Sequence, residues 1–285
     1  MKTIPLFINT KSGNYAAFNN NRVYPDSVKL IKLDSITERV DDITQELSIH
    51  PKRVLIAGGD GTVSFIAGLL ESSVEVGIVP IGTENVLART FGVPTNPTEA
   101  IELGLRSQNL IEVDGLRVDD RVYFLNISAG VSSLVIKDTA TEHKQKFGKF
   151  AYVFHTIKHI MQPEKYTFDI TIDGKEQTLQ ATEMLVANVK EFGMKRVTVS
   201  ENIDSNDGKA DVYVYVKDSL IPDSRNIETQ ADKIIVEKEL THVGTGERIQ
   251  IRSKDSIFFQ GDGDEIITTN LDIKVEPSFL TLISP

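Results

Sequence analysis

A glycine-rich turn suggests the first chemistry in the sequence. Residues 58–62 have the sequence Gly-Gly-Asp-Gly-Thr, directly after an apolar run and directly before a helical pattern over 64–70. Glycines let a ligand approach the backbone closely, and the free N–H groups of a helix N-terminus attract anions. The turn therefore predicts a phosphate-binding site. Because Asp60 would repel a phosphate, we expect this carboxylate to act through Mg²⁺, a water molecule or a substrate hydroxyl, unless it caps the helix.

Two other polar loops each follow a strand-like segment. The loop over 9–14 is Asn-Thr-Lys-Ser-Gly-Asn, and the loop over 81–85 is Ile-Gly-Thr-Glu-Asn. In open parallel sheets, ligands bind beyond the carboxyl ends of the strands. We therefore expect the glycine turns at 58–61 and 82–83 to contribute to one site. The loop over 9–14 by itself also fits an ordinary strand-to-helix connection.

Three further groups of polar residues have both a structural and a functional interpretation. The oxygen-rich turn over 204–209 lacks the spacing of an EF-hand and fits either a β-turn or a metal site. The pair His155 and His159 fits an exposed helix better than a metal site. Four lysines form either a solvated helix face or a contact with an anionic lipid surface: Lys144, Lys146, Lys149 and Lys158.

The elements that position these residues alternate between strand and helix in the first part of the chain. Strand-like segments occupy 4–9, 28–33, 53–57, 74–80 and 110–114, and helical spacing is found over 36–47, 64–70, 86–91 and 97–105. Such alternation predicts a parallel sheet with right-handed crossovers.

The pattern changes after about residue 115, where the nearest candidate for a linker covers 115–121. A strand-like run over 122–128 and a long helical stretch over 141–161 precede a series of short β segments at 166–172, 178–189, 196–200, 210–217, 233–236, 247–252, 256–260 and 271–276. Asp173-Gly174 is typical of a hairpin turn. Many short strands with frequent turns predict a sandwich-like β domain.

The predicted fold is thus α/β with two domains. A three-layer parallel-sheet domain over 1–115 would carry the glycine turns and their phosphate site, and the tail over 277–285 would return to it. A β-rich domain over 116–276 would bind the substrate, with the active site in the cleft between the two.

Composition limits the classes of function. The chain has 285 residues, of which 40% are hydrophobic and 25% charged, as in globular proteins. It contains no cysteine, which excludes disulfides and thiolate chemistry. A formal net charge of −10 argues against a nucleic-acid partner. Neither a signal peptide nor a membrane-spanning stretch is recognised, so we expect a cytoplasmic protein.

Together, these motifs resemble the superfamily of diacylglycerol kinases, sphingosine kinases and NAD kinases, and most closely the bacterial diacylglycerol kinase catalytic type. Residues 80–89 match the signature Pro-x-Gly-Thr-x-Asn-(Asp)-x-Ala-Arg of the lipid-kinase branch, and Asn9-x-x-Ser12-Gly13 matches its first signature. Later marks of the family follow in the right order at 125–130, 147–152, 186–188, 207–208 and 262–264. NAD kinases share the glycine turn, but the chain lacks their Asn-Glu pair.

The resemblance implies a set of ligand-binding residues. The residues that would bind the phosphates of ATP are Asn9, Ser12, Gly13, Gly58, Gly59, Asp60, Gly61, Thr62, Gly82, Thr83 and Asn85. Asp60 would also be catalytic, as a partner of Mg²⁺ or of the acceptor hydroxyl. The turn over 204–209 would hold a structural Mg²⁺ through the Asp207 side chain and the carbonyls of Asp204 and Lys209. Val86 occupies the position of an Asp in the diacylglycerol kinase pattern, although sphingosine kinases also lack this acid.

The resemblance also implies a catalytic base. The last signature motif of the family is Asp-Gly-Glu, whereas this chain has Asp262-Gly263-Asp264 at the matching position. Asp264 is one methylene shorter than Glu, so its carboxylate would lie about 1 Å back, which can lower a rate by roughly 10²-fold. Three alternatives follow: the surroundings compensate, Asp262 is the working carboxylate, or the activity is reduced. An acidic surface hairpin without a catalytic role is the structural alternative.

The function implied is that of an ATP-dependent lipid kinase with Mg²⁺ as cofactor. It would transfer the γ-phosphate to an alcohol group of a diacylglycerol-like or sphingoid-like lipid, as in phospholipid metabolism, with the protein peripheral at the membrane surface. One alternative is a kinase of the same fold with a soluble acceptor such as NAD. Another is a non-catalytic nucleotide-binding or lipid-binding protein of kinase descent. The oligomeric state stays open, with a homodimer among the alternatives.

Overall fold

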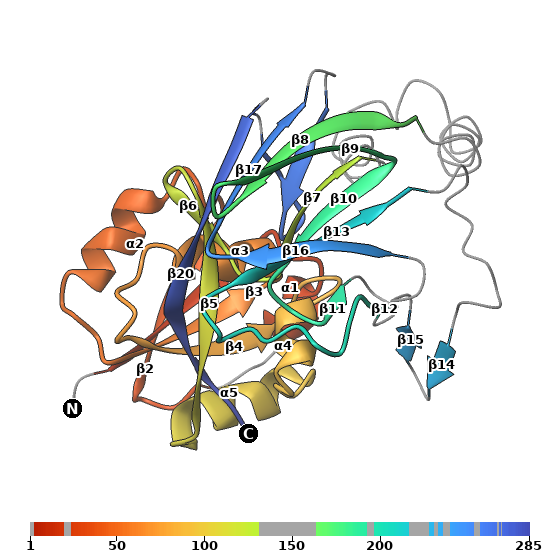
Figure 1. Cartoon of the computed structure of the whole chain (residues 1–285). Coiled ribbons are helices and arrows are strands. Elements are labelled where there is room, and N and C mark those ends of the chain that lie inside the picture. Colours follow the sequence, from red (N-terminus) through yellow and green to blue (C-terminus); the bar gives the residue numbers. More distant parts are fainter. Residues whose placement is uncertain are drawn as a thin grey trace, which may run out of the picture. The chain divides into compact units, whose positions relative to one another are not determined.

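The computed structural model describes residues 3–19, 24–130, 164–192, 197–216, 228–230, 233–235, 240–253, 257–266, 268 and 270–285 (Figure 1). The chain divides into two compact units. The first contains residues 1–115, 121–124 and 276–285, and the second contains 116–120 and 125–275. The expected helix over 141–161, with its Gly-x-x-x-Tyr motif, two histidines and four lysines, lies outside the described residues.

The first unit is built on a parallel sheet. Its strands are β1 (Ile4–Asn9), β2 (Val28–Leu33), β3 (Arg53–Gly58), β4 (Glu75–Pro80) and the end of β20 (Asn270–Ile283). The strand order is β2-β1-β3-β4-β20, and each neighbouring pair is parallel. β3 and β4 are buried almost throughout, as expected for strands whose two faces are both covered.

Five helices belong to this unit: α1 (Tyr15–Asn19), α2 (Val40–Leu47), α3 (Asp60–Ala67), α4 (Val86–Thr90) and α5 (Pro97–Arg106). The last begins where predicted, because Asn96 accepts the N–H of Thr98 and Pro97 occupies the first helical position. α2 begins later than predicted, since residues 36–39 form turns. Its start is preceded by a hydrogen bond from the N–H of Glu38 to the hydroxyl of Ser35.

Among the described residues, the strands of the second unit form two larger sheets, in which neighbouring strands are antiparallel. One sheet has the order β16-β13-β10-β7-β18-β19. In the other, β17, β8 and β9 follow the first part of β20. The strands are β7 (Asn126–Gly130), β8 (Tyr166–Ile172), β9 (Lys175–Ala181), β10 (Glu183–Ala187), β13 (Ala210–Tyr215), β16 (Thr241–Gly246), β17 (Arg248–Ser253), β18 (Phe259–Gly261) and β19 (Asp264–Ile266). A small sheet joins β11 (Glu191–Phe192), β12 (Val197–Thr198), β14 (Glu228–Gln230) and β15 (Lys233–Ile235).

The structure corrects the expected strand over 178–189. This run is divided between β9 and β10, which pair with different sheets. The break falls at Thr182, whose backbone N–H and hydroxyl both donate to the carbonyl of Tyr215, at 2.8 and 2.9 Å. The buried hydroxyl thus adds a second hydrogen bond to the backbone bond between Thr182 and Tyr215, at the residue where the chain passes from one sheet to the other.

The expected strand over 122–128 is also divided, into β6 (Arg121–Tyr123) and β7. The Arg121 guanidinium lies over the ring of Phe65 in α3, 5.1 Å from its centroid, so this segment belongs to the first unit. The linker expected at 115–121 is instead the end of β5 (Leu110–Val118) and the turn into β6. A hydrophobic pattern cannot locate such a break, because both strands are apolar.

β20 is longer than predicted and contributes to both units (Figure 1). Ser278 within it has a positive φ of 50°. Its N–H donates to the carboxylate of Asp114 at 2.7 Å, and Asp114 is fully buried. The sequence analysis missed β16, whose two glycines weaken the strand pattern. No helix among the described residues is long and apolar enough to cross a membrane. The predicted two-domain α/β fold class is confirmed.

Candidate functional site

The two glycine turns of the first unit touch through their backbones. β3 and β4 are parallel neighbours with Gly58 opposite Pro80, so both turns leave the same end of the sheet. The N–H groups of Ile81 and Gly82 both donate to the carbonyl of Gly58, at 3.1 and 3.2 Å. A Cβ atom on Gly82 would lie 2.3 Å from the Cα of Gly59. The contact therefore requires glycine, since any side chain would separate the turns.

The loop over 9–14 joins these turns. The N–H of Asn14 donates to Ile81 O at 3.0 Å, and its side-chain amide donates to Gly82 O at 2.8 Å. Nδ2 of Asn9 donates to the hydroxyl of Thr62 at 2.8 Å. The structure thus brings together, from three segments of the chain, most of the residues predicted to hold phosphates: Asn9, Ser12, Gly13, Gly58, Gly59, Gly61, Thr62, Gly82 and Thr83.

Asn85 closes the second turn on itself. Its Oδ1 accepts the N–H of Gly82 at 2.9 Å, and its Nδ2 donates to the Gly82 carbonyl at 3.0 Å. The backbone of Asn85 has φ 51°, a left-handed conformation that Asn tolerates better than most residues. The side chain predicted to bind nucleotide therefore also fixes the shape of the turn.

Asp60 caps a helix, but not the one that its sequence position suggests. It is the first residue of α3, yet its carboxylate accepts the N–H of Val86 at 3.0 Å and that of Leu87 at 2.8 Å. These two residues begin α4, whose N-cap residue Asn85 uses its side chain on Gly82 and makes no capping bond to the helix. A carboxylate at a helix N-terminus is stabilised by the unpaired N–H groups and the helix dipole. The charge of Asp60 is thus partly compensated within the protein.

A second carboxyl group, which the sequence analysis did not single out, lies in the second turn. Glu84 is exposed as a whole, but partial desolvation raises the pKa of its carboxyl group, and the negative charge of Asp60 raises this pKa further, whereas Arg89 lowers it. Glu84 could have been predicted as a site residue from the sequence, because it lies between two predicted nucleotide-binding residues, Thr83 and Asn85.

The acidic turn of the second unit is a tight hairpin between β18 and β19. Gly261 pairs with Asp264, leaving Asp262 and Gly263 as the two central residues with φ 49° and 89°. Positive φ at both positions is what a type I′ turn requires, and Asp-Gly suits it. Asp262 is buried, and its Oδ1 accepts the N–H groups of Leu125 and Asn126 at 2.9 and 3.2 Å.

A buried amide supports the same hairpin from β18. Nε2 of Gln260 donates to the hydroxyl of Ser128 at 2.7 Å, and its Oε1 accepts the N–H of Gly263 at 3.0 Å. Asp264, the predicted base, follows this turn directly as the first residue of β19 and is partly exposed. The sequence analysis missed Gln260, because no local pattern connects it to residue 263.

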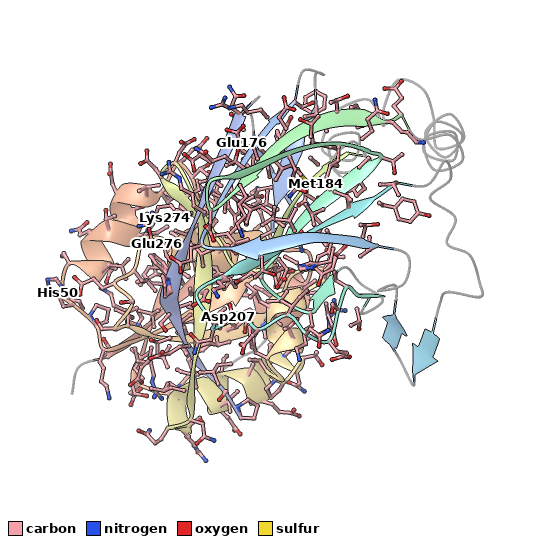
Figure 2. The ribbon with its side chains drawn as sticks, viewed as in Figure 1. His50, Glu176, Met184, Asp207, Lys274 and Glu276 are labelled. Atoms are coloured by element: carbon pink, nitrogen blue, oxygen red, sulfur yellow. The ribbon has the colours of Figure 1, made fainter. Side chains whose placement is uncertain are left out.

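The turn over 204–209 has two local side-chain hydrogen bonds. Oδ1 of Asp204 accepts the N–H of Asn206 at 3.1 Å, and Oδ1 of Asp207 accepts that of Lys209 at 2.9 Å. Figure 2 labels Asp207 in this exposed turn. Carboxylate and carbonyl oxygens are the ligands that Mg²⁺ prefers, so the donor set fits this ion. In the described part of the chain, no three His, Asp or Glu side chains cluster as a metal site.

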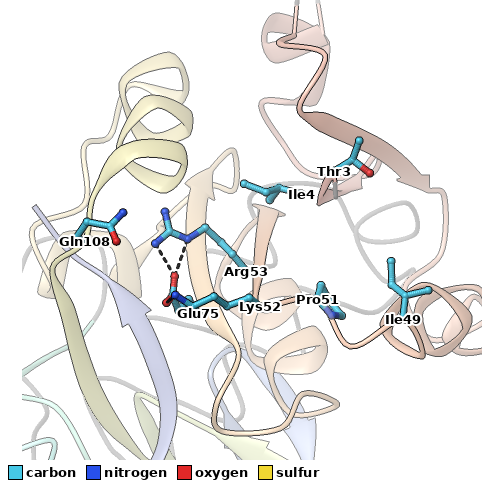
Figure 3. A pocket seen from close by; sticks show the side chains of 8 residues that line it. All are labelled: Thr3, Ile4, Ile49, Pro51, Lys52, Arg53, Glu75 and Gln108. Atoms are coloured by element: carbon cyan, nitrogen blue, oxygen red, sulfur yellow. Dashed lines mark hydrogen bonds and ion pairs between the residues drawn. The ribbon is translucent and has the colours of Figure 1, made fainter. Parts of the chain in front are cut away.

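A pocket of about 290 Å³ lies at the other ends of β3 and β4, where these strands begin (Figure 3). Arg53 and Glu75 form an ion pair in it, and Lys52 contacts the second carboxylate oxygen of Glu75 at 3.0 Å. Arg53 also donates to the carbonyls of Gly104 and Ser107 at 3.0 Å. These charges are paired, and the pocket lies at the opposite ends of β3 and β4 from the glycine turns.

Comparison with protein families adds a second line of evidence. The model of the diacylglycerol kinase catalytic domain matches residues 3–118. The model of the YegS C-terminal NAD kinase beta sandwich-like domain matches residues 126–284, more than half of the chain. A Staphylococcus haemolyticus protein named "Putative lipid kinase" is 28% identical over 246 residues, which cover 84% of this chain and 79% of that protein. A Staphylococcus epidermidis protein, also named "Putative lipid kinase", is 26% identical over 238 residues, which cover 81% of this chain and 76% of that protein.

Solved structures show the same fold. A crystal structure described as a putative diacylglycerol kinase from Bacillus anthracis has a TM-score of 0.77 and 22% identity, covering 100% of this chain and 95% of that one. An NAD kinase from Archaeoglobus fulgidus in complex with ATP has a TM-score of 0.50 and 10% identity, covering 100% and 94%. The predicted resemblance is confirmed: the chain belongs to the kinase family that combines a diacylglycerol kinase catalytic domain with a YegS-type C-terminal β-sandwich-like domain.

Proposed function

We propose that the chain is an ATP-dependent lipid kinase, which transfers the γ-phosphate of ATP to a hydroxyl group of a diacylglycerol-like or sphingoid-like lipid. The observation that carries this proposal is the site made by three loops, 9–14, 58–62 and 81–85, in a chain of this kinase family. Membership of a kinase family implies ATP as a substrate. Backbone N–H groups at glycine turns suit its phosphates.

Asp60 is compatible with a phosphate nearby because α4 compensates part of its charge. Each carboxylate oxygen has a second lone pair that a cation or a hydroxyl can use. Mg²⁺, when bound, would neutralise phosphate charge and orient the γ-phosphate. The turn over 204–209 would hold a second, structural Mg²⁺ through Asp207 and the carbonyls of Asp204 and Lys209.

Asp264 would accept the proton of the acceptor hydroxyl. The hydroxyl oxygen then forms a bond to the γ-phosphorus while the bond from this phosphorus to the β,γ-bridging oxygen breaks, and ADP leaves with that oxygen. Asp262 is the weaker candidate for the base, since it is buried and its Oδ1 already accepts two backbone N–H groups. The lipid would be met at a membrane surface, with the protein bound peripherally.

The test is transfer of a radioactive γ-phosphate from ATP to a panel of lipids in mixed micelles, with NAD as the soluble alternative acceptor and ATP binding measured separately. Labelling of a diacylglycerol or sphingoid lipid is expected. Labelling of NAD alone would replace the proposal with a soluble acceptor. ATP binding without labelling of any acceptor would indicate a non-catalytic protein.

A matched pair of variants identifies the base. Asp264→Asn should lower transfer by at least roughly 10²-fold, within the range for a general base, whereas Glu265→Gln alters the adjacent exposed carboxylate and should leave the rate within about twofold. The opposite ranking would assign the base to Glu265. An active Asp264→Asn variant together with an inactive Asp262→Asn variant would assign it to Asp262.

A further inference from the structure

The backbone conformation at the end of β18 is unfavourable by itself. Asp262 has φ 49°, a left-handed value that costs energy for any residue with a Cβ atom. The structure compensates through contacts on both sides of the turn. Asp262 accepts the N–H groups of Leu125 and Asn126, and its own N–H donates to Asn126 O at 3.2 Å. The next residue, Gly263, donates its N–H to Gln260.

Gln260 uses both ends of its amide. Oε1 accepts from Gly263 at 3.0 Å, while Nε2 donates to Ser128 Oγ at 2.7 Å and lies 3.4 Å from Asn126 Oδ1. The residue is 8% exposed, and it lies opposite Ser128 in the pairing of β18 with β7. The amide of Gln260 therefore accepts from one partner and donates to the other at the same time. Gln260 thus links the turn to the buried strand β7 through one hydrogen bond to each.

Asp264 directly follows this turn, as the first residue of β19. We propose that Gln260 is a positioning residue for Asp264, whose carboxylate takes the proton of the acceptor hydroxyl. Gln260 fixes the peptide between Asp262 and Gly263, one residue before Asp264. This inference rests on the proposed function. The backbone at residue 264 must be placed more accurately for an Asp than for a Glu. The shorter Asp side chain has fewer rotatable bonds with which its carboxylate could compensate for a displaced backbone. A misplacement of about 1 Å can lower a rate by roughly 10²-fold.

The test compares Gln260→Met, which keeps the length of the side chain and removes both hydrogen bonds, with Gln177→Met on the exposed strand β9. The first readout is amide hydrogen exchange, which does not depend on activity. Exchange at Gly263 and Asp264 should rise at least about tenfold in Gln260→Met and not in Gln177→Met. Unchanged exchange would overturn the inference whether or not the protein is a kinase.

The second readout is the steady-state rate of phosphate transfer. Gln260→Met should lower kcat by roughly 10- to 100-fold with KM for ATP within about twofold. In the background of Asp264→Asn, the same substitution should have no further effect, because Gln260 acts through Asp264. An unchanged kcat, or a parallel loss of kcat and ATP affinity, would overturn the inference and leave the proposed function standing.

Ser128→Ala provides a second variant in case Gln260→Met does not fold. It removes the anchor of Nε2 without touching the turn, so exchange at Gly263 and kcat should change in the same directions by a smaller factor. If the wild-type protein transfers phosphate to no acceptor, the proposed function fails and the inference fails with it. The wild-type assay therefore separates the two failures.

Discussion

Asp60 shows how a carboxylate can lie beside the proposed phosphate site. Its two oxygens accept N–H groups from Val86 and Leu87, which lie 26 and 27 positions later in the chain. The residue therefore joins the first glycine turn to the helix that follows the second. Its loss should affect both the position of α4 and the binding of phosphates.

Asp60→Asn is predicted to lower stability by about 1–2 kcal/mol, because the amide has a single acceptor oxygen for two N–H groups. In the presence of Mg²⁺, ATP affinity should fall at least about tenfold, because the amide no longer offers the charged oxygen that is proposed to act on the phosphates through this ion. Transfer should be lost, as it should in Asp60→Ala. Urea unfolding and titration calorimetry with ATP would measure these effects. Asp26→Asn, at an exposed position, is the control. Unchanged ATP affinity would limit Asp60 to helix capping.

Glu84 gives the phosphate site a predicted pH dependence. Its carboxyl has a pKa above the ordinary Glu value of 4.5, because of desolvation and then the charge of Asp60. Below this raised pKa the group is neutral, and above it the negative charge opposes phosphate. ATP affinity should therefore fall as the pH rises through the raised pKa. The same shift means that the folded state binds more protons than the unfolded chain in this window, so its contribution to stability also falls as the pH rises.

Glu84→Gln should remove this step and bind ATP more tightly at neutral pH, by roughly threefold to tenfold for a screened charge. The dissociation constant of ATP would be measured across the acidic to neutral range for both proteins, so that titration of ATP itself cancels. Glu99→Gln in α5 is the matched control. Parallel curves for the wild type and Glu84→Gln would contradict the prediction.

At the scale of elements, the ion pair of Arg53 and Glu75 connects three parts of the first unit. It lies at the start of β3 and β4, and Arg53 also binds two carbonyls at the C-terminal end of α5. A cation at a helix C-terminus satisfies unpaired carbonyls and interacts favourably with the dipole. Burial opposes ionisation of Glu75, but hydrogen bonds from Arg53 and Lys52 outweigh it, so the pKa of Glu75 is lowered.

Arg53→Met is predicted to destabilise the protein by about 3–5 kcal/mol, since it leaves Glu75 buried without its main partner. The double variant Arg53→Met with Glu75→Met should be less destabilised than Arg53→Met. Urea unfolding of the three proteins would decide this. The stabilisation from Glu75 should be present above the unfolded-state pKa of 4.5 and be lost as the pH falls through the lower folded-state pKa. Equal stability of the single and double variants would contradict the argument.

At the scale of the whole molecule, the first unit is not a continuous stretch of chain. It includes residues 276–285, which contribute the end of β20 next to β4. Leu280, Leu282 and Ile283 of this segment are almost fully buried. Burial of one such side chain contributes about 1.5–3 kcal/mol, so the three together contribute an amount comparable with the net stability of a domain.

A chain that ends at residue 275 should therefore fail to fold its first unit. Circular dichroism and limited proteolysis would show loss of helix and rapid cleavage within residues 1–115, whereas Leu282→Ala in the full chain should remain folded and lose about 2–5 kcal/mol. Protection of residues 1–115 in the shortened chain would show that the last strand is dispensable.

The α/β alternation, the glycine turns and the family could be recognised from the order of the residues alone. Each depends on residues close together in the chain: buried parallel strands are continuous apolar runs, and a glycine turn before a helix has a local signature. The buried strand over 4–9 has its predicted bounds for this reason. The strand over 28–33 also has its predicted bounds, although it is an edge strand that is mostly accessible to solvent.

Contacts between groups that are distant in the sequence could not be predicted and are seen only in the folded chain. Asp60 caps α4 rather than its own helix, Thr182 divides an apolar run by binding Tyr215, and Gln260 holds the turn before Asp264. Each is a hydrogen bond between a side chain and the backbone of another element or of a turn. Hydrophobic periodicity indicates which face of a strand is buried, but not which strand pairs with it or which backbone group a buried polar side chain will reach. Strand pairing and these long-range hydrogen bonds depend on how the whole chain packs.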